Sequence, residues 1–166
     1  MEISLLKNHG LKTREDCIKP GFNCRMDEIH ASILNVQLKY FKKNTILRRK
    51  KAMLYNKLLS PYVEVPFEND GEYHVYQTYI IQADNRDKLY NYLRSHGVEC
   101  LIHYPYPTHK QSIYKNNKYK NLKYSEIYSK RILSLPLYPS LSENNIEKIS
   151  TLIKKFYIWI WFHTII

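Results

Sequence analysis

The sequence is poor in glycine and proline, and this shortage excludes one class of protein. Only 4 glycines and 7 prolines occur among 166 residues, which argues against low-complexity disorder. Apolar residues make up 44% of the chain and include 16 tyrosines, so there is enough material for a buried core. The length suits one ordinary domain or parts of two.

Cysteine is also scarce, and its distribution argues against a disulfide framework. The 3 cysteines, Cys17, Cys24 and Cys100, are odd in number and far apart, and no C-x-x-C motif occurs. We therefore expect free thiols in a reducing, cytoplasmic compartment. The 7 histidines show no short ligand spacing with a cysteine, so no metal site is expected. The first residues have neither the basic region nor the cleavage site of a signal peptide.

Acidic residues are outnumbered: 15 acidic against 26 basic residues give a net charge of +11, which favours an anionic partner. The basic residues fall within helical patterns, as at Lys42–Lys43, Arg48–Lys51 and Lys154–Lys155. We interpret them as solvated helix faces and expect no nucleic-acid partner. A basic module that binds nucleic acid or another anion stays as the alternative, because tyrosines can stack on bases.

Hydrophobic periodicity predicts long helices followed by a small α+β domain. An apolar stripe runs from Met26 to Phe41, and a break at Lys42–Asn44 is expected to separate it from a second helix. The stripe must bury against a surface that the small domain alone does not provide. The remaining predictions are a second helix at 45–59, strands at 62–67, 74–82 and 98–103, helices at 85–96 and 124–133, and a last helix after Ser142.

The predicted ends of these helices depend on single residues. Asp84 is expected to cap the helix at 85–96, and Gly97 to end it in the left-handed conformation. Beyond the last helix, the apolar run Tyr157–Ile166 is too short to span a bilayer. It suits a buried terminal strand, a membrane-surface anchor or a frameshifted end, and we favour an atypical end.

Four sequence blocks in a fixed order resemble one enzyme family. They are Leu6–Gly10, Gly21–Glu28, His103–His109 and Leu133–Pro139. Together they are similar to the DegT/DnrJ/StrS-type sugar aminotransferases. The resemblance implies the C-terminal portion of a type I pyridoxal-phosphate fold: the end of a large α/β domain, connector helices and a small mixed sheet with helices. Residues 1–59 would be the large-domain remnant with connectors, 60–157 the small domain and 158–166 the atypical tail.

The resemblance also implies an activity. Family members form homodimers and use pyridoxal phosphate to move an amino group onto a nucleotide-linked keto sugar. Their Schiff-base lysine lies tens of residues before the position of Asn8, and only 7 residues precede Asn8 here. Lys7 and Lys12 do not lie in a matching context. We therefore expect the chain alone to have no catalytic residue, to bind no cofactor and to be inactive; a separately encoded N-terminal half, or a structural remnant of a decayed gene, are alternatives.

The same resemblance assigns the site residues. Asn23 matches an asparagine that reaches across the dimer to the cofactor phosphate, with a helix cap as its alternative. Arg25 either faces an anion or pairs with a neighbouring carboxylate. His103, Tyr104 and His109 match a loop that faces the sugar nucleotide, with a strand-end role as the alternative for His103. His9 and Gly10 are expected to shape a turn.

Overall fold

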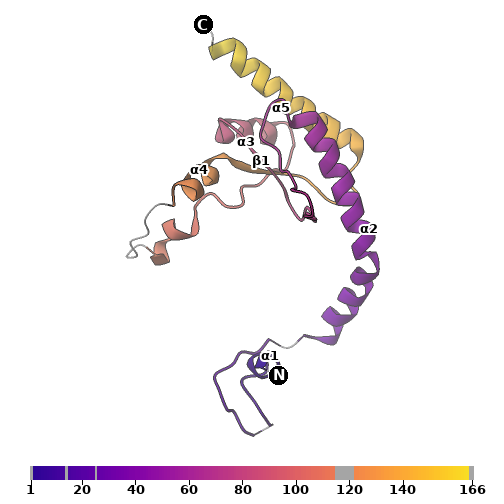
Figure 1. The fold of residues 1–166 in the computed structure, drawn as a ribbon, viewed down its shortest axis with the longest axis vertical. Helices are drawn as coiled ribbons and strands as arrows, with labels where there is room; N and C mark the ends of the chain where they lie inside the picture. Colours follow the sequence, from indigo (N-terminus) through magenta and orange to yellow (C-terminus); the bar gives the residue numbers. More distant parts are fainter. Residues whose placement is uncertain (1, 14, 25, 115–121, 165–166) are drawn as a thin grey trace. The chain divides into compact units, whose positions relative to one another are not determined.

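The computed structural model describes all residues except 1, 14, 25, 115–121 and 165–166 (Figure 1). The chain forms two compact units, Met1–Lys42 and Lys43–Ile166. The elements are α1 (Glu2–Leu6), α2 (Glu28–Leu59), β1 (Tyr79–Gln82), α3 (Arg86–Ser95), η1 (Thr108–Lys110), η2 (Ser112–Tyr114), α4 (Lys123–Arg131), β2 (Ile132–Leu135) and α5 (Glu143–Thr164).

The α2 helix is continuous, so the predicted break at Lys42–Asn44 is wrong. Lysine is a good helix former, and a single asparagine costs only a fraction of a kcal/mol, roughly 0.7 at most. Neither glycine nor proline interrupts the segment, so nothing in it forces the hydrogen-bond ladder to open. The end is as expected, with Pro61 following the last helical residue closely.

The apolar stripe of α2 is exposed within the first unit. Ile29, Leu38 and Phe41 expose 75%, 66% and 60% of their surface, and Ile33 exposes 49%. The chain on its own thus leaves this stripe uncovered, as the pattern predicted for a helix that belongs against a larger surface.

The sheet described in the second unit has two antiparallel strands, so the prediction of a small mixed sheet is wrong. In β1 and β2, Ile80 pairs with Ser134. Two predicted strands contribute only single antiparallel bridges, Glu64 to Gln82 on one side and Leu101 to Ser134 on the other. Prolines follow both bridges, Pro66 and Pro105, and a residue without an N–H cannot extend a ladder.

The core of the second unit forms where the later half of α2, the two strands, α3 and α5 meet (Figure 1). Tyr55 of α2 stacks on Tyr79 of β1 with ring centroids 4.8 Å apart. Side chains with no more than 1% exposure come from every one of these elements: Ala52, Tyr55, Leu59, Tyr79, Ile81, Ala83, Leu89, Leu93, Cys100, Leu133, Ile146 and Ile153.

The helix ends confirm two of three predictions. Gly97 follows α3 with a φ of 76°, the left-handed conformation expected there. The Ser142 Oγ accepts a hydrogen bond from the backbone N–H of Asn145 at 3.2 Å, as a cap of α5 should. The prediction for Asp84 is wrong, because Asn85 is the cap residue of α3, with a left-handed backbone and no side-chain cap bond.

The basic run at Arg48–Lys51 is not the solvated face that we predicted. Arg48 donates to the carbonyls of Gln77 and Leu137 at 3.2 and 3.0 Å. Arg49 is largely buried, and Lys51, 8% exposed, donates to the Pro139 carbonyl. Only Lys50 is exposed. Three of the four cations therefore tie α2 to loops through carbonyl or carboxylate acceptors, which the helical period alone does not reveal.

The last element, α5, runs to Thr164, so the buried terminal strand proposed for its end is wrong. The buried residues of this helix recur at three- and four-residue steps, as a helix requires. They are Ile146, Ile149, Ile153 and Phe156. Among the described residues, no helix combines the length and apolarity that crossing a bilayer requires.

Candidate functional site

The first two sequence blocks meet in the first unit. Asn8 forms an antiparallel bridge with Asn23, and the His9 N–H donates to the Phe22 carbonyl at 2.9 Å. His9 and Gly10 have φ values of 57° and 72°, which confirms that they shape a turn. A Cβ on Gly21 would lie 2.2 Å from the Gly10 backbone nitrogen, so the two glycine blocks pack backbone to backbone.

Asn23 is exposed and borders a shallow hollow of about 530 Å³ that Met26, Asp27 and Glu28 also line. Its position five residues before the first residue of α2 makes the helix-cap alternative wrong. Its amide is of the right type to donate to a phosphate. Arg25, the other residue expected near the cofactor, lies outside the described residues.

His103 follows the bridge at Leu101 and is held by the sheet. Its Nδ1 lies 2.9 Å from the Oγ of Ser134, the central residue of β2 that pairs with Ile80 on one side and Leu101 on the other. The imidazole is half-buried. The contact gives His103 a defined orientation and is compatible with both interpretations, a strand-end histidine and a residue that presents its ring to a ligand.

Tyr104 and Tyr106 are exposed aromatic residues of the Pro-rich loop. They expose 72% and 67% of their surface, and the Tyr104 ring contacts that of His103 edge to face at 5.6 Å. The two prolines of this loop keep it out of regular structure. An exposed phenol beside an ordered imidazole can offer both stacking and hydrogen bonding to a ligand.

His109 lies in η1 and pairs with α4. Its Nε2 is 3.0 Å from Glu126 Oε1, which also lies 3.2 Å from the Lys110 Nζ. Hydrogen bonding from His109, with a further one from Lys110, lowers the pKa of the Glu126 carboxyl. The His109 side chain is only 10% exposed, so its ring anchors the loop to α4 in addition to any ligand contact.

Sequence reasoning missed Ser134 and Glu126, the two partners of the candidate histidines. Ser134 lies within the Leu133–Pro139 block, to which no site role was assigned, and Glu126 lies on a helix without a motif. Each is distant in the chain from its histidine, by 31 and 17 residues respectively. In β2, Leu133, Ser134 and Leu135 are all buried, so no alternation of burial marks Ser134.

The pyridoxal phosphate implied by the resemblance does not have a complete site in the hollow beside Asn23. That cofactor needs a lysine amine for its aldehyde and donors for its dianionic phosphate. Asn23 can supply one donor, whereas the Asp27 and Glu28 carboxylates in the same hollow repel a phosphate. The described residues of this hollow fit one part of a cofactor site and not the whole.

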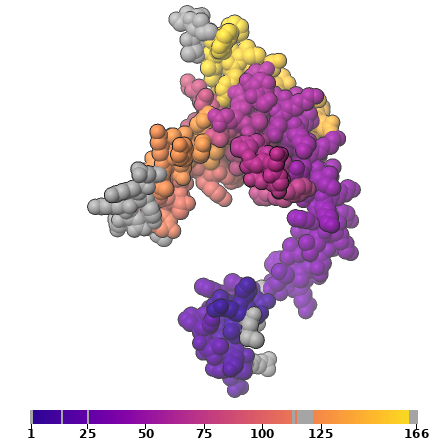
Figure 2. Space-filling model, viewed as in Figure 1, coloured from indigo at the N-terminus to yellow at the C-terminus, as the bar shows by residue number. Residues whose placement is uncertain are grey.

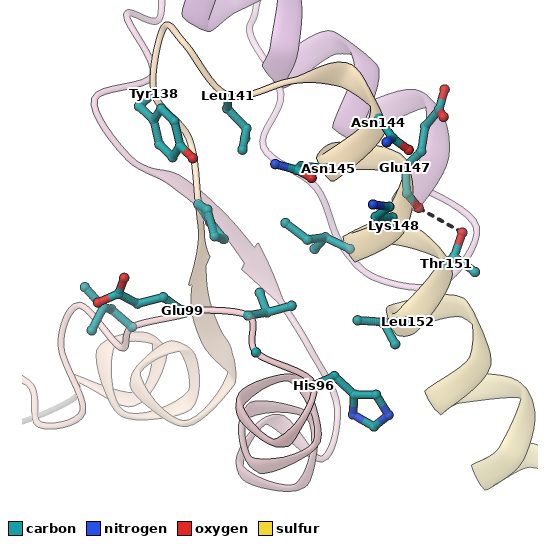
Figure 3. A pocket seen from close by; sticks show the side chains of 15 residues that line it. His96, Glu99, Tyr138, Leu141, Asn144, Asn145, Glu147, Lys148, Thr151 and Leu152 are labelled. Carbon is teal, nitrogen blue, oxygen red and sulfur yellow. Dashed lines mark hydrogen bonds between the residues drawn. The ribbon is translucent and has the colours of Figure 1, made fainter.

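A further hollow of the second unit lies elsewhere. It is a groove of about 930 Å³ between α5 and the segment after α3, and Figure 3 shows Asn145, Lys148 and Leu152 of α5 facing it from one side and His96 from another. Thr151 Oγ1 donates to the Glu147 carbonyl at 2.8 Å within α5. Neither His103, Tyr104 nor His109 lines this groove, although Pro136 and Tyr138 of the Leu133–Pro139 block do.

Known proteins similar to this chain include transaminases of nucleotide-linked sugars. The chain is 28% identical over 93% of its length to a dTDP-3-amino-3,6-dideoxy-alpha-D-galactopyranose transaminase of Aneurinibacillus thermoaerophilus. It is 32% identical over 87% of its length to a UDP-2-acetamido-2-deoxy-3-oxo-D-glucuronate aminotransferase of Pseudomonas aeruginosa. The chain spans 43% and 40% of these two relatives, less than half of each.

Solved structures agree with this assignment. A DegT DnrJ EryC1 StrS aminotransferase from Brucella abortus superimposes with a TM-score of 0.87 at 34% identity, over 93% of this chain and 42% of that one. The fold is thus that of the corresponding part of a larger aminotransferase. A family model matches residues 1–154. The chain belongs to the DegT/DnrJ/EryC1/StrS aminotransferase family.

Proposed function

We propose that this chain is the C-terminal part of a pyridoxal-phosphate-dependent aminotransferase that acts on nucleotide-linked keto sugars. The observation that carries the proposal is the family match over residues 1–154, in a chain that spans only 43% of a nucleotide-sugar transaminase relative. Bound pyridoxal phosphate would supply an electron sink for moving the amino group. The residues of this chain would bind and orient the cofactor phosphate and the sugar nucleotide.

In the proposed enzyme, Asn23 donates to the cofactor phosphate of the partner subunit. Support comes from its exposure and from the bridge to Asn8, which fixes its backbone between two motif blocks. The acidic neighbours Asp27 and Glu28 disfavour a phosphate at Asn23 alone, so the other subunit must supply the remaining donors. We propose that Arg25, outside the described residues, is one further contact of this region.

On the substrate side, we propose that His103, Tyr104 and His109 face the sugar nucleotide. The contact of His103 with Ser134 orients its ring, and the exposed Tyr104 beside it offers a surface for stacking. His109 would hold the loop against α4 through Glu126 while its edge borders the ligand. Lys110, bonded to the same carboxylate, adds positive charge for a diphosphate.

The 166 residues by themselves are proposed to be inactive in the cytoplasm, and to work only when combined with the rest of the fold as a homodimer. The exposed stripe of α2, with Ile29, Leu38 and Phe41, is the surface that a large domain or partner subunit would cover. A separately encoded N-terminal half is one source of that domain.

The test is reconstitution. The purified chain is mixed with pyridoxal phosphate, and a Schiff-base absorbance band that glutamate removes would contradict inactivity of the chain alone. The N-terminal half of a relative is then supplied in trans, and amino transfer to a nucleotide-linked keto sugar is followed.

In the reconstituted enzyme, N23A should weaken cofactor binding about tenfold, because a hydrogen bond to a charged group is lost. The matched control is N145A, which removes an exposed asparagine of α5 that lies outside the motif blocks. Equal cofactor affinity of N23A and N145A would remove Asn23 from the phosphate site.

A further inference from the structure

The outer face of α5 changes character along its length. Lys148, Thr151, Lys154 and Lys155 occupy this face in the middle of the helix, and all four are exposed. At 100° per residue, the same face continues one turn later through aromatic and aliphatic side chains. These are Ile158, Trp159, Trp161 and Phe162, with exposures of 41%, 60%, 65% and 60%.

The opposite face of α5 packs on the rest of the second unit as far along the helix as Ile160. Phe156 packs against Tyr92 of α3 with ring centroids 5.4 Å apart, and the Tyr157 hydroxyl donates to the Asp84 carbonyl at 2.8 Å. Ile160 is still partly buried against the core. The exposed aromatic side chains therefore belong to the solvent side of an anchored helix, and Figure 2 shows these last turns in yellow at the surface.

We propose that the aromatic end of α5 binds the surface of an anionic lipid bilayer. This name stands for the exposed residues Ile158, Trp159, Trp161 and Phe162. Tryptophan and phenylalanine concentrate at bilayer interfaces, where lysines next to them meet lipid headgroups. Lys155 and Lys154 precede Trp159 and Trp161 by four and seven residues, about 6–11 Å along a helix axis. An interfacial helix buries its apolar side chains about 5–10 Å deep, so the lysines would lie at headgroup level when the aromatics are inserted.

Charge favours lipid over a second copy of the chain as the occupant of this end. The net charge of +11 attracts the chain to an anionic surface and makes two copies repel each other. The proposed contact is with the bilayer surface; among the described residues, no helix is long and apolar enough to cross it. The inference depends on α5 alone and is independent of the proposed aminotransferase activity.

The chain contains its own reporter, because Trp159 and Trp161 are its only 2 tryptophans. Mixing the 166-residue chain with vesicles of phosphatidylglycerol and phosphatidylcholine should shift tryptophan emission to the blue and sediment the protein with the vesicles. Pure phosphatidylcholine vesicles should bind it at least tenfold more weakly. Salt near 1 M, where the screening length is about 3 Å, should release it from anionic vesicles.

Two variants separate binding from folding. K154Q/K155Q changes exposed side chains and should weaken sedimentation with anionic vesicles roughly twenty-five-fold, since each lysine near such a surface contributes about fivefold. F162S should weaken it at least as much as one lysine, whereas F67S, which alters an exposed phenylalanine of a loop, should leave it unchanged. Circular dichroism checks that each variant is folded.

Several outcomes would overturn the inference. One is the absence of a blue shift with anionic vesicles at low salt, and another is equal loss of binding in F162S and F67S. A blue shift that depends on protein concentration without lipid would assign the aromatic end to contact between copies instead.

Discussion

His103 and Ser134 link the candidate substrate loop to the sheet through a contact of 2.9 Å between Nδ1 and Oγ. Ser134 is 6% exposed and sits where β2 pairs with β1 and bridges to Leu101. The hydroxyl of this strand residue therefore fixes the position of the His103 ring, at the start of the loop.

We expect S134A to destabilise the chain by about 1 kcal/mol, the net contribution of one hydrogen bond. It should also move the NMR signals of the His103 imidazole ring, because the ring loses the partner that orients it. S140A, a substitution in an exposed turn, is the control. Unchanged ring signals of His103 in S134A would show that the contact does not orient the ring.

Y79F should cost about 1 kcal/mol at neutral pH, because the Tyr79 hydroxyl donates to Asn56 Oδ1 at 2.7 Å while its ring stacks on Tyr55. Burial raises the pKa of Tyr79 well above its usual range. A raised folded-state pKa means that its contribution is fully present below pH about 10, where the unfolded phenol ionises, and is lost as pH rises further.

Urea denaturation at pH values from neutral to alkaline checks both parts of this prediction. The wild type should lose stability more steeply than Y79F above pH about 10. Y73F, which removes the hydroxyl of a 61% exposed tyrosine, should behave like the wild type. Parallel curves for the wild type and Y79F would contradict the alkaline prediction.

Glu68 should make the chain sensitive to acid. Its carboxylate accepts from both terminal nitrogens of Arg49, at 2.5 and 2.9 Å, and this hydrogen bonding, with a further bond from the His74 N–H, lowers the pKa of Glu68. A lowered folded-state pKa means that the stabilisation is present above pH about 4.3 and is lost as pH falls through the folded value.

Thermal melting from neutral pH to pH about 3 tests whether the contribution of Glu68 to stability is lost in acid. E68Q should melt at a lower temperature than the wild type at neutral pH, and the gap should close in acid. E147Q, in an exposed position of α5, provides the comparison. A constant gap between E68Q and the wild type across this range would exclude the Arg49 pair as the cause.

G97A should destabilise the chain by about 1 kcal/mol through its backbone alone. Gly97 has a φ of 76°, and a Cβ there would meet no atom within 4 Å, so the cost is conformational and not steric. G97N should cost less, since asparagine tolerates the left-handed region better than alanine. Chemical denaturation that ranks G97A at or above G97N in stability would contradict this account.

The sequence was informative wherever the signal was local. Gly97 predicted the end of α3, because glycine adopts positive φ readily. Ser142 predicted the start of α5, because its hydroxyl can cap a helix. The four motif blocks, read in order, predicted the family that the comparisons show. These features depend on a few neighbouring residues or on motif order, both of which a sequence carries directly.

Tertiary structure decided what depends on partners distant in the chain. The isolated bridges of Glu64 and Leu101 replaced two predicted strands, because strand length depends on which neighbours are available to pair. Lys51 is buried, and its ammonium donates a hydrogen bond to the Pro139 carbonyl, 88 residues away. The pairing of His109 with Glu126 likewise arises only when η1 and α4 are brought together, since hydrogen bonding between side chains follows position in space and not period in the sequence.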